Sequence, residues 1–256
     1  MSTHDELAQM LMREHAAGTR FHPMGLADLA AAYGVQGRFV QLMGETAGAV
    51  AGYKIGLTSA RMQKMCGIDQ PVAGVIFGTR VMASGVTLQA RRYHHVGLEF
   101  EVGVRLGRDL PPAQAPFARE QVAEAVDGVC AAVEVVDDRN ADYATLEARS
   151  LIADNSWNAG AVLGTFATSW DKLEDAAGIV WVNGQEIDRG YGRDVLGHPF
   201  VPLTWLANHL AASGGALRAG DVVLTGSLIT TRFPKEAGRY RYELGGIGTV
   251  ELSVAF

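Results

Sequence analysis

A run of alternating apolar and polar residues, from His94 to Leu106, constrains the fold of this chain more than any other segment. Its period of two is that of a β-strand with one apolar and one polar face. Glu99 and Glu101 fall on the same face, and we expect their Cα atoms to lie about 6.5–7 Å apart along the strand. The apolar face of this strand consists of Leu98, Phe100, Val102, Val104 and Leu106.

Two carboxylates on one strand face repel each other unless a positive charge lies between them. Hard divalent cations such as Mg²⁺ prefer oxygen ligands, so Glu99 and Glu101 predict one half of a metal site. The alternative, which the pattern alone leaves open, is a solvated strand face.

Two further charged residues lie in apolar strand patterns. Glu134 interrupts the apolar run from Cys130 to Val136, where an ionised carboxylate is costly to bury unless it is paired or bound to a metal. It is therefore a candidate third ligand, with an exposed position on an edge strand as the alternative. Lys54 lies in a strand predicted over residues 50–57, where a lone lysine is usually solvated.

The composition restricts the classes of function. A chain of 256 residues with 48% hydrophobic residues can bury a substantial core, and its net charge of -6 argues against a nucleic-acid or anionic-membrane partner. Cys66 and Cys130 lie far apart without metal-binding spacing, so neither a disulfide framework nor a zinc site is expected. The acidic N-terminus lacks the pattern of a signal peptide, and no 18-residue apolar run occurs, which predicts a cytoplasmic protein.

Periodicity divides the chain near residue 50. Helices are expected from about Thr3, over residues 26–33 with an end at Gly34, and over residues 36–48. Beyond residue 50, glycine separates short apolar runs in the manner of strands and turns. The elements predicted there are a strand over 74–78, a hairpin over 79–92, a helix over 117–127, a strand over 130–139, a pocket-lining loop or an ordinary turn over 151–158, a hairpin over 178–187, a helix over 202–213, a strand over 220–227 and closing strands over 240–244 and 248–254.

Eight short motifs occur in one order from Tyr53 to the C-terminus: Tyr53–Ser59, Asp69–Pro71, Glu99–Glu101, Arg108–Pro111, Val133–Val135, Ala153–Asn155, Leu196–Pro199 and Leu224–Ser227. Together they resemble the bacterial 2-oxopent-4-enoate (2-hydroxypentadienoate) hydratases. These enzymes belong to the fumarylacetoacetate hydrolase-like group, which also contains 4-oxalocrotonate decarboxylase.

The resemblance implies an α+β fold in which mixed β-sheets roll around a metal site, with helices outside. It assigns residues 51–256 to the catalytic domain and residues 1–50 to a small N-terminal helical region. It also implies that Glu99, Glu101 and Glu134 bind Mg²⁺ or Mn²⁺, with Lys54 in the same site. A homo-oligomer is implied, and an association with a sister lyase of the same pathway is a further prediction.

The activity implied is that of a metal-dependent hydro-lyase in the meta-cleavage catabolism of aromatic compounds. Its small anionic substrate, a 2-hydroxy-2,4-dienoate or its 2-oxo tautomer, gains water and becomes a 4-hydroxy-2-oxo acid. The candidate residues fall into two groups: the catalytic candidates are Lys54, Glu101 and Asp154, and the candidates for substrate contact are Lys54, Asn155, Ser156, Ser227 and His198. For His198, a structural histidine bonded to backbone is the alternative.

Decarboxylation of a 2-oxo-3-enedioate is the second hypothesis, followed by an acylpyruvate hydrolase and a binding protein without activity. Two departures from the hydratase pattern bear on this choice. Val72 stands where hydratases of this group often have an acid, which favours the decarboxylase. Ser156 and Trp157 stand where relatives commonly have smaller residues, which predicts a different pocket shape.

Overall fold

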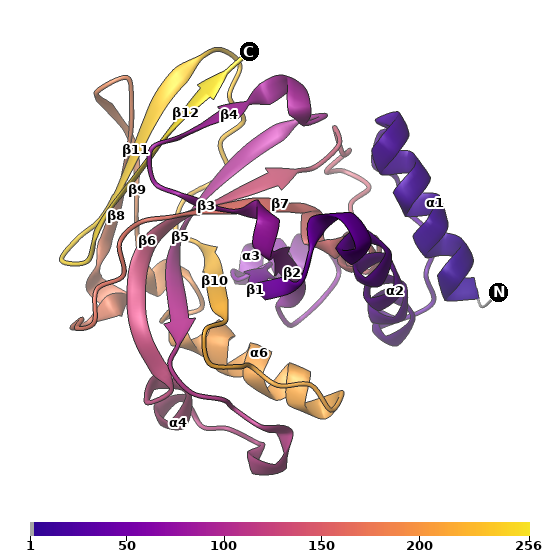
Figure 1. The fold of residues 1–256 in the computed structure, drawn as a ribbon, viewed down its shortest axis with the longest axis horizontal. Coiled ribbons are helices and arrows are strands. Elements are labelled where there is room, and N and C mark those ends of the chain that lie inside the picture. The colour runs from indigo at the N-terminus through magenta and orange to yellow at the C-terminus, as the bar shows by residue number, and fades with distance from the viewer. Residues whose placement is uncertain (1–2) are drawn as a thin grey trace.

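The computed structural model describes residues 3–256 and contains two β-sheets with helices on their outer sides (Figure 1). The mixed α+β architecture predicted from the sequence is confirmed. Its helices are α1 (Thr3–Ala17), α2 (Leu29–Ala47), α3 (Ala60–Met65), α4 (Arg119–Ala123), α5 (Ala148–Ala153) and α6 (Phe200–Ala212). None of the helices in residues 3–256 is long and apolar enough to cross a membrane.

The larger sheet has seven strands in the order β2-β1-β10-β5-β6-β7-β3. They are β1 (Val50–Gly56), β2 (Val72–Phe77), β3 (Val81–Ala83), β5 (Val96–Leu106), β6 (Val126–Asp137), β7 (Asn158–Leu163) and β10 (Val222–Ser227). The long central strands β5 and β6 are buried along almost their whole length, as their apolar sequences require.

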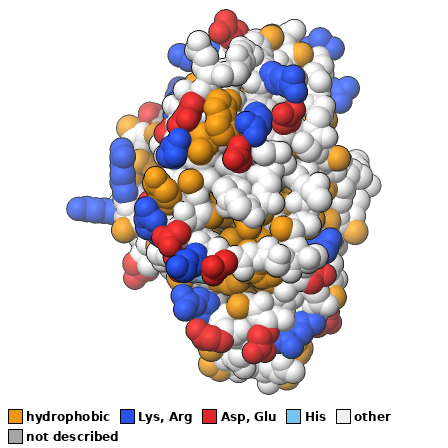
Figure 2. All heavy atoms as spheres, turned by 90° about the vertical axis from the view of Figure 1, so that its left-hand side faces the viewer, with side chains coloured by type: hydrophobic (Ala, Val, Ile, Leu, Met, Phe, Trp, Pro, Cys, Tyr) orange, Lys and Arg blue, Asp and Glu red, His pale blue; other side chains and the backbone are white. Residues whose placement is uncertain are grey.

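The smaller sheet has five strands in the order β4-β12-β11-β8-β9. They are β4 (Val86–Gln89), β8 (Ala177–Val182), β9 (Gln185–Tyr191), β11 (Gly238–Leu244) and β12 (Gly248–Ala255). A single apolar core joins the two sheets, with Phe100, Val133 and Tyr242 among its fully buried members. Figure 2 shows the face of the molecule that lies on the left of Figure 1. On this face, side chains of both charges are interspersed with apolar ones.

The N-terminal helices differ from the prediction. One continuous helix, α2, replaces the two helices expected on either side of Gly34. A Cβ atom at Gly34 would lie 2.6 Å from the His4 ring, so the glycine permits α1 to pack closely against α2 and does not end a helix. Asp28 caps the start of α2 by accepting a hydrogen bond from the Ala31 N–H.

Two other element predictions are wrong. The segment 79–92 forms no hairpin, because β3 pairs with β7 in the larger sheet and β4 pairs with β12 in the smaller one. The helix expected over 117–127 is reduced to α4, since the apolar residues from Val126 onward enter β6. The segment 151–158, for which the sequence left a loop and a turn open, begins with the last residues of α5 and continues as a tight turn.

The strand register places the charged residues of the larger sheet together. In the antiparallel pair β5–β6, Glu99 lies opposite Glu134, and in the pair β5–β10, Glu101 lies opposite Ser227. Strand β1 runs parallel to β10 and brings Lys54 opposite Leu224. Residues that face each other across neighbouring strands project from the same side of the sheet.

Candidate active site

Three carboxylates meet on one side of the larger sheet. Glu99, Glu101 and Glu134 each offer an oxygen atom, and these three atoms lie within 4.8 Å of one another. Glu101 and Glu134 are fully buried, whereas Glu99 is partly exposed. The period of two along β5 and the register of β5 with β6 account for this cluster.

A donor from a neighbouring element holds each carboxylate. The backbone N–H of Gly226 donates to Glu101 Oε2 at 2.6 Å, the Asn158 side-chain amide donates to Glu134 Oε1 at 2.9 Å, and the Thr231 hydroxyl donates to Glu99 Oε1 at 2.6 Å. Glu101 Oε1 is buried and accepts no hydrogen bond from residues 3–256. A buried carboxylate oxygen without a hydrogen bond needs another partner, because burial also removes it from water.

Gly226 has to be glycine for this arrangement. Its φ of 114° lies in a region that side chains disfavour, and a Cβ atom there would lie 2.1 Å from the Thr58 hydroxyl oxygen. The glycine therefore lets this backbone lie against Thr58 while its N–H donates to Glu101.

Lys54 is the cation of this cluster. It is 4% exposed, and its Nζ lies 3.2 Å from Glu134 Oε2 and donates to the Ser156 carbonyl oxygen at 3.2 Å. Burial by itself lowers the pKa of Lys54, but the nearby carboxylates, Glu134 first, outweigh it, so the pKa is raised above its ordinary value. The side chain is therefore a buried ammonium ion.

The acids show the opposite effect of burial. Burial, reinforced by the charges of Glu134 and Glu99, raises the pKa of Glu101 well above its ordinary value. Burial also raises the pKa of Glu134 to about 7, although the positive charge of Lys54 acts against the shift. When all three carboxylates are ionised, one ammonium leaves two negative charges without a balance, which a divalent cation would supply.

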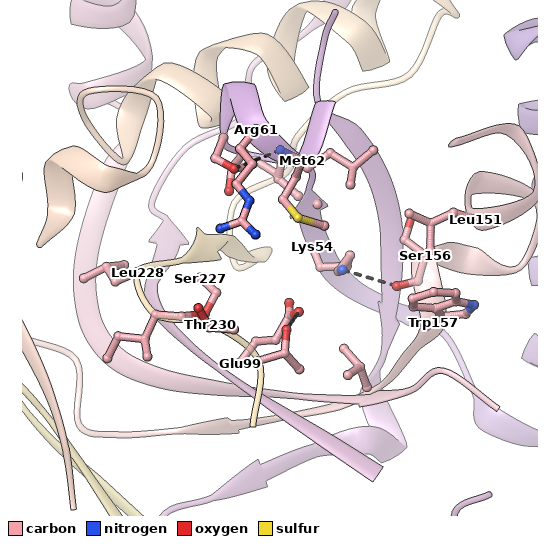
Figure 3. A pocket seen from close by; sticks show the side chains of 18 of the residues that line it. Lys54, Arg61, Met62, Glu99, Leu151, Ser156, Trp157, Ser227, Leu228 and Thr230 are labelled. Carbon is pink, nitrogen blue, oxygen red and sulfur yellow. Dashed lines mark hydrogen bonds between the residues drawn. The ribbon is translucent and has the colours of Figure 1, made fainter. Parts of the chain in front are cut away.

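A cavity of about 360 Å³ opens beside this cluster (Figure 3). Lys54 and Glu99 line it, together with Ser156 and Trp157 on one side and Ser227 on the other. The sequence prediction placed four of these residues, Lys54, Glu99, Ser156 and Ser227, at the site, and the structure brings them to one cavity. The Ser227 hydroxyl donates to the Ile229 carbonyl oxygen at 2.7 Å and accepts from the Phe100 N–H at 2.9 Å.

The turn that carries Ser156 is held in an uncommon conformation. Asn155, Ser156 and Trp157 have φ angles of 49°, 49° and 59°, in the left-handed region that costs about 1–3 kcal/mol for each residue other than glycine. The Asn155 side chain accepts from the Val75 N–H at 2.7 Å and donates to the Val75 carbonyl at 3.0 Å. Asn155, predicted to contact the substrate, instead fastens this turn to β2 and lies outside the cavity.

Asp154, a predicted catalytic residue, does not line this cavity either. Its carboxylate is buried and binds the Arg139 guanidinium at 2.7 Å and the His15 imidazole at 2.5 Å. These contacts fasten α5 to α1 and to the chain after β6. Both carboxylate oxygens of Asp154 are engaged in these contacts, and its catalytic role stays a prediction.

His198 also lies outside the cavity, as the alternative interpretation anticipated. Its Nδ1 accepts a hydrogen bond from the Phe200 N–H at 2.9 Å, and its Nε2 lies 3.5 Å from Glu174. Burial lowers its pKa below the ordinary value. The imidazole thus accepts the N–H of Phe200, the first residue of α6, and helps to fix the start of this helix.

The sequence reasoning missed three residues at the site. Asn158 and Thr231 orient Glu134 and Glu99, and Arg61 projects from α3 into the cavity (Figure 3). No local pattern marks them, because an amide, a hydroxyl and an exposed arginine are common in turns and short helices.

Comparison with known proteins identifies related chains. The family described as fumarylacetoacetate (FAA) hydrolase C-terminal matches residues 48–255. A 2-keto-4-pentenoate hydratase of Burkholderia vietnamiensis is 32% identical over 259 residues and covers 98% of each chain. A 2-hydroxyhexa-2,4-dienoate hydratase of Comamonas testosteroni is 33% identical and covers 86% of this chain and 84% of the relative.

Among solved structures, the 4-oxalocrotonate decarboxylase of Pseudomonas putida G7, complexed with magnesium and adipate, superimposes with a TM-score of 0.90. The match covers 98% of this chain and 97% of the decarboxylase. With 24% sequence identity, this likeness establishes the fold.

Proposed function

The chain belongs to the fumarylacetoacetate (FAA) hydrolase C-terminal family, and from that membership we propose that it is a metal-dependent hydro-lyase. It adds water to a 2-hydroxy-2,4-dienoate and forms a 4-hydroxy-2-oxo acid, in the catabolism of aromatic compounds. The observation that carries the proposal is the cluster of three carboxylates with a buried lysine beside a cavity. The proposal is supported by the two hydratases whose sequences are similar to this chain over most of its length.

The residues of the cluster fit a divalent metal ion. Glu99, Glu101 and Glu134 would hold Mg²⁺ or Mn²⁺ through oxygen atoms, the ligands that such ions prefer. The buried Glu101 Oε1 without a partner and the two unbalanced negative charges support this assignment. When bound, the ion supplies a Lewis acid for the oxygens at the 2-oxo acid end of the substrate.

The reaction requires several proton movements. The 2-hydroxyl group loses a proton, C5 gains one, and water then adds its oxygen at C4 and a proton at C3. Lys54 reaches the cavity from β1 as an ammonium ion, so it can neutralise the substrate carboxylate or donate a proton. Glu101 is the second proposed proton carrier, on the condition that the bound ion leaves one of its carboxylate oxygens free. Ser156 and Ser227 are the proposed contacts with the substrate.

Val72 remains the departure that supports the decarboxylase hypothesis. It is the first residue of β2, is fully buried and does not line the cavity. A valine cannot carry the proton that an acid at this position would carry. Decarboxylation of a 2-oxo-3-enedioate remains the second candidate, supported by the fold shared with the decarboxylase.

Two substrates separate these activities. We expect the Mg²⁺-loaded protein to convert 2-hydroxypenta-2,4-dienoate into 4-hydroxy-2-oxopentanoate and to release no CO₂ from 2-oxohex-3-enedioate. Product analysis by chromatography, with a CO₂ assay, measures both outcomes. Release of CO₂ while the dienoate accumulates would identify a decarboxylase.

The metal-free protein should become less stable as the pH rises. Glu101 and Glu134 have pKa values above the ordinary value of about 4.3, so the folded state binds more protons than the unfolded state above that pH. Stability is therefore greatest below about pH 4.3 for these two groups and is lost as the pH rises through about 7, the pKa of Glu134. Melting curves recorded in chelator between pH 5 and 8 measure the slope.

Addition of Mg²⁺ at pH 8 should reverse this loss. A ligand present at 100 times its Kd stabilises the folded state by about 2.7 kcal/mol. Two results together would contradict the assignment of the metal site: a melting temperature in chelator that does not change with pH, and a melting temperature that does not rise when Mg²⁺ or Mn²⁺ is added.

Three other properties stay predictions. They are the homo-oligomeric state, the association with a sister lyase, and the division of the chain into an N-terminal region (1–50) and a catalytic domain (51–256). Light scattering on the purified protein measures the first.

A further inference from the structure

Asp138 is a buried carboxylate outside the metal cluster. It follows the end of β6 and is 1% exposed. Its Oδ1 lies 2.7 Å from His95 Nδ1 and accepts from the Asn140 N–H at 2.9 Å. Its Oδ2 accepts from the Tyr143 hydroxyl at 3.0 Å. The His95 ring in turn stacks on Phe233, with the ring centroids 4.5 Å apart, so the carboxylate is held firmly in one position.

Tyr143 connects this carboxylate to the active-site cavity. It lines the cavity, and its ring packs edge-on against that of Trp157, with the ring centroids 5.9 Å apart. Asp138 does not line the cavity. Burial raises the pKa of Tyr143, and the negative charges of Asp138 and Glu99 raise it further. The hydroxyl is therefore neutral and lies within electrostatic reach of the carboxylate cluster.

The direction of the hydrogen bond between Tyr143 and Asp138 decides what the hydroxyl can offer. A phenol has one hydrogen and can also accept hydrogen bonds through its oxygen. Because the hydrogen of Tyr143 is donated to Asp138, its oxygen meets any other neighbour as an acceptor. A water molecule in the cavity can therefore donate to this oxygen.

The proposed hydration needs such an acceptor, because water becomes a good nucleophile only when a base takes its proton. Lys54 is an ammonium ion and has no lone pair to offer. The carboxylates of the cluster would hold the metal ion. Asp194 also lines the cavity, but it is exposed, and its Oδ2 accepts from the Tyr191 N–H at 2.7 Å within its own turn.

We infer that Tyr143 takes the proton of the water that adds to C4 and passes its own proton to Asp138. This inference rests on the proposed function, which supplies the hydration step. One O–H bond of the water breaks as its oxygen bonds to C4, the freed proton goes to Tyr143 Oη, and the tyrosine proton goes to Asp138 Oδ2. Tyr143 is then a catalytic residue, Asp138 the base behind it, and His95 a positioning residue.

The electrons and protons of this step balance. The π electrons between C3 and C4 move towards the 2-oxo group and form an enolate, which takes a proton at C3 from the Lys54 ammonium. Asp138 then releases the water proton to solvent, and Lys54 regains a proton from solvent. The sum is the addition of one molecule of water.

Tyr143→Phe tests the inference, because it removes the hydroxyl and keeps the ring. The tautomerisation of 2-hydroxypenta-2,4-dienoate does not use this hydroxyl, so the Mg²⁺-loaded variant should still form 2-oxopent-3-enoate. Formation of 4-hydroxy-2-oxopentanoate should slow by about 10²-fold or more, and 2-oxopent-3-enoate should accumulate. Proton NMR follows the three compounds, and the same solution without protein gives the uncatalysed rates.

Further variants identify the base. Asp138→Asn should also accumulate 2-oxopent-3-enoate, because an amide does not take up the proton. Asp194→Asn, at the exposed acid of the cavity wall, should form the product at the wild-type rate. The matched control is Tyr191→Phe, which removes a hydroxyl at the end of β9, outside the cavity, and should also be unchanged.

Each result decides the question. Hydration at the wild-type rate by Tyr143→Phe, or an equal slowing of both steps without accumulation of 2-oxopent-3-enoate, overturns the role of Tyr143 and leaves the proposed function in place. Accumulation in Asp194→Asn and not in Asp138→Asn overturns the role of Asp138. Tyr143→Phe decides by itself if Asp138→Asn does not fold. A wild-type protein that consumes no dienoate overturns the proposed function together with this inference.

Discussion

Glu101→Gln is expected to abolish measurable turnover of 2-hydroxypenta-2,4-dienoate at millimolar Mg²⁺. Glu101 is the fully buried member of the cluster whose Oε1 accepts no hydrogen bond from residues 3–256. An amide offers a neutral oxygen in place of an anionic one, and loss of an orienting partner alone costs metal sites about 10–100-fold in affinity. Loss of a ligand should exceed that range. Calorimetry with Mg²⁺ and Mn²⁺ measures the affinity.

The same substitution should raise the melting temperature of the metal-free protein. The glutamine oxygen can still accept from the Gly226 N–H, and its NH₂ group can donate to a neighbouring carboxylate. One of the three mutually repelling charges is removed, so the folded state gains stability at pH 8, where burial opposes ionisation of Glu101. A loss of activity with a gain in stability distinguishes a metal ligand from a structural residue.

The control for this experiment is Glu120→Gln. Glu120 is exposed on α4, away from the cavity, and should show wild-type turnover, Mg²⁺ affinity and melting temperature. If Glu101→Gln bound Mg²⁺ with the wild-type affinity, the carboxylate cluster would not be the metal site.

The cluster could be predicted from the sequence because regular strands determine it. The period of two along β5 places Glu99 and Glu101 on one face, and a carboxylate within the apolar run of β6 demands a partner. The pairing of Glu99 with Glu134 depends on the register of β5 with β6, which sequence spacing does not contain. The family resemblance supplied that connection.

The directions of the polar side chains around the turn 155–157 could not be predicted from the sequence. Asp154, Asn155 and Ser156 are neighbours in the chain, yet one binds Arg139 and His15, one fastens β2, and one faces the cavity. Three successive left-handed residues turn these side chains in different directions, and this conformation is set by tertiary contacts. Spacing alone cannot separate a side chain that supports a site from one that lines it.

Tertiary contacts also decided the elements that were predicted wrongly. Gly34 interrupts a helical pattern, but close contact with α1 compensates for its low helix propensity. The strands on either side of Gly85 pair with β7 and β12, which follow far later in the chain. The local sequence determines the apolar and polar pattern of each strand, but it does not determine which other strand it pairs with.

Burial of Lys54 changes the expectation for its replacement. From the sequence, a strand lysine should contribute little to stability, so Lys54→Met would keep the wild-type melting temperature. The structure places the ammonium group in an ion pair with Glu134 and in contact with the Ser156 carbonyl. Removal of one partner from a buried ion pair costs about 3–5 kcal/mol, so the metal-free variant should melt well below the wild type.

In the presence of Mg²⁺, Lys54→Met should reduce turnover by about 10²-fold or more, the usual contribution of a positioned acid or base. Its affinity for Mg²⁺ should equal or exceed that of the wild type, because the substitution removes a positive charge from beside the carboxylates and leaves all three of them in place. Lys54→Met and Glu101→Gln are thus expected to lose activity for different reasons, the first with the metal bound and the second without it.

Calorimetry with Mg²⁺ and turnover at saturating Mg²⁺ separate the two variants, and Lys64→Met on the exposed side of α3 is the matched control. Normal turnover in Lys54→Met would remove the lysine from the reaction and restrict it to the ion pair with Glu134. Loss of Mg²⁺ binding would show instead that the ion pair with Lys54 is needed to hold the Glu134 carboxylate in position for the ion.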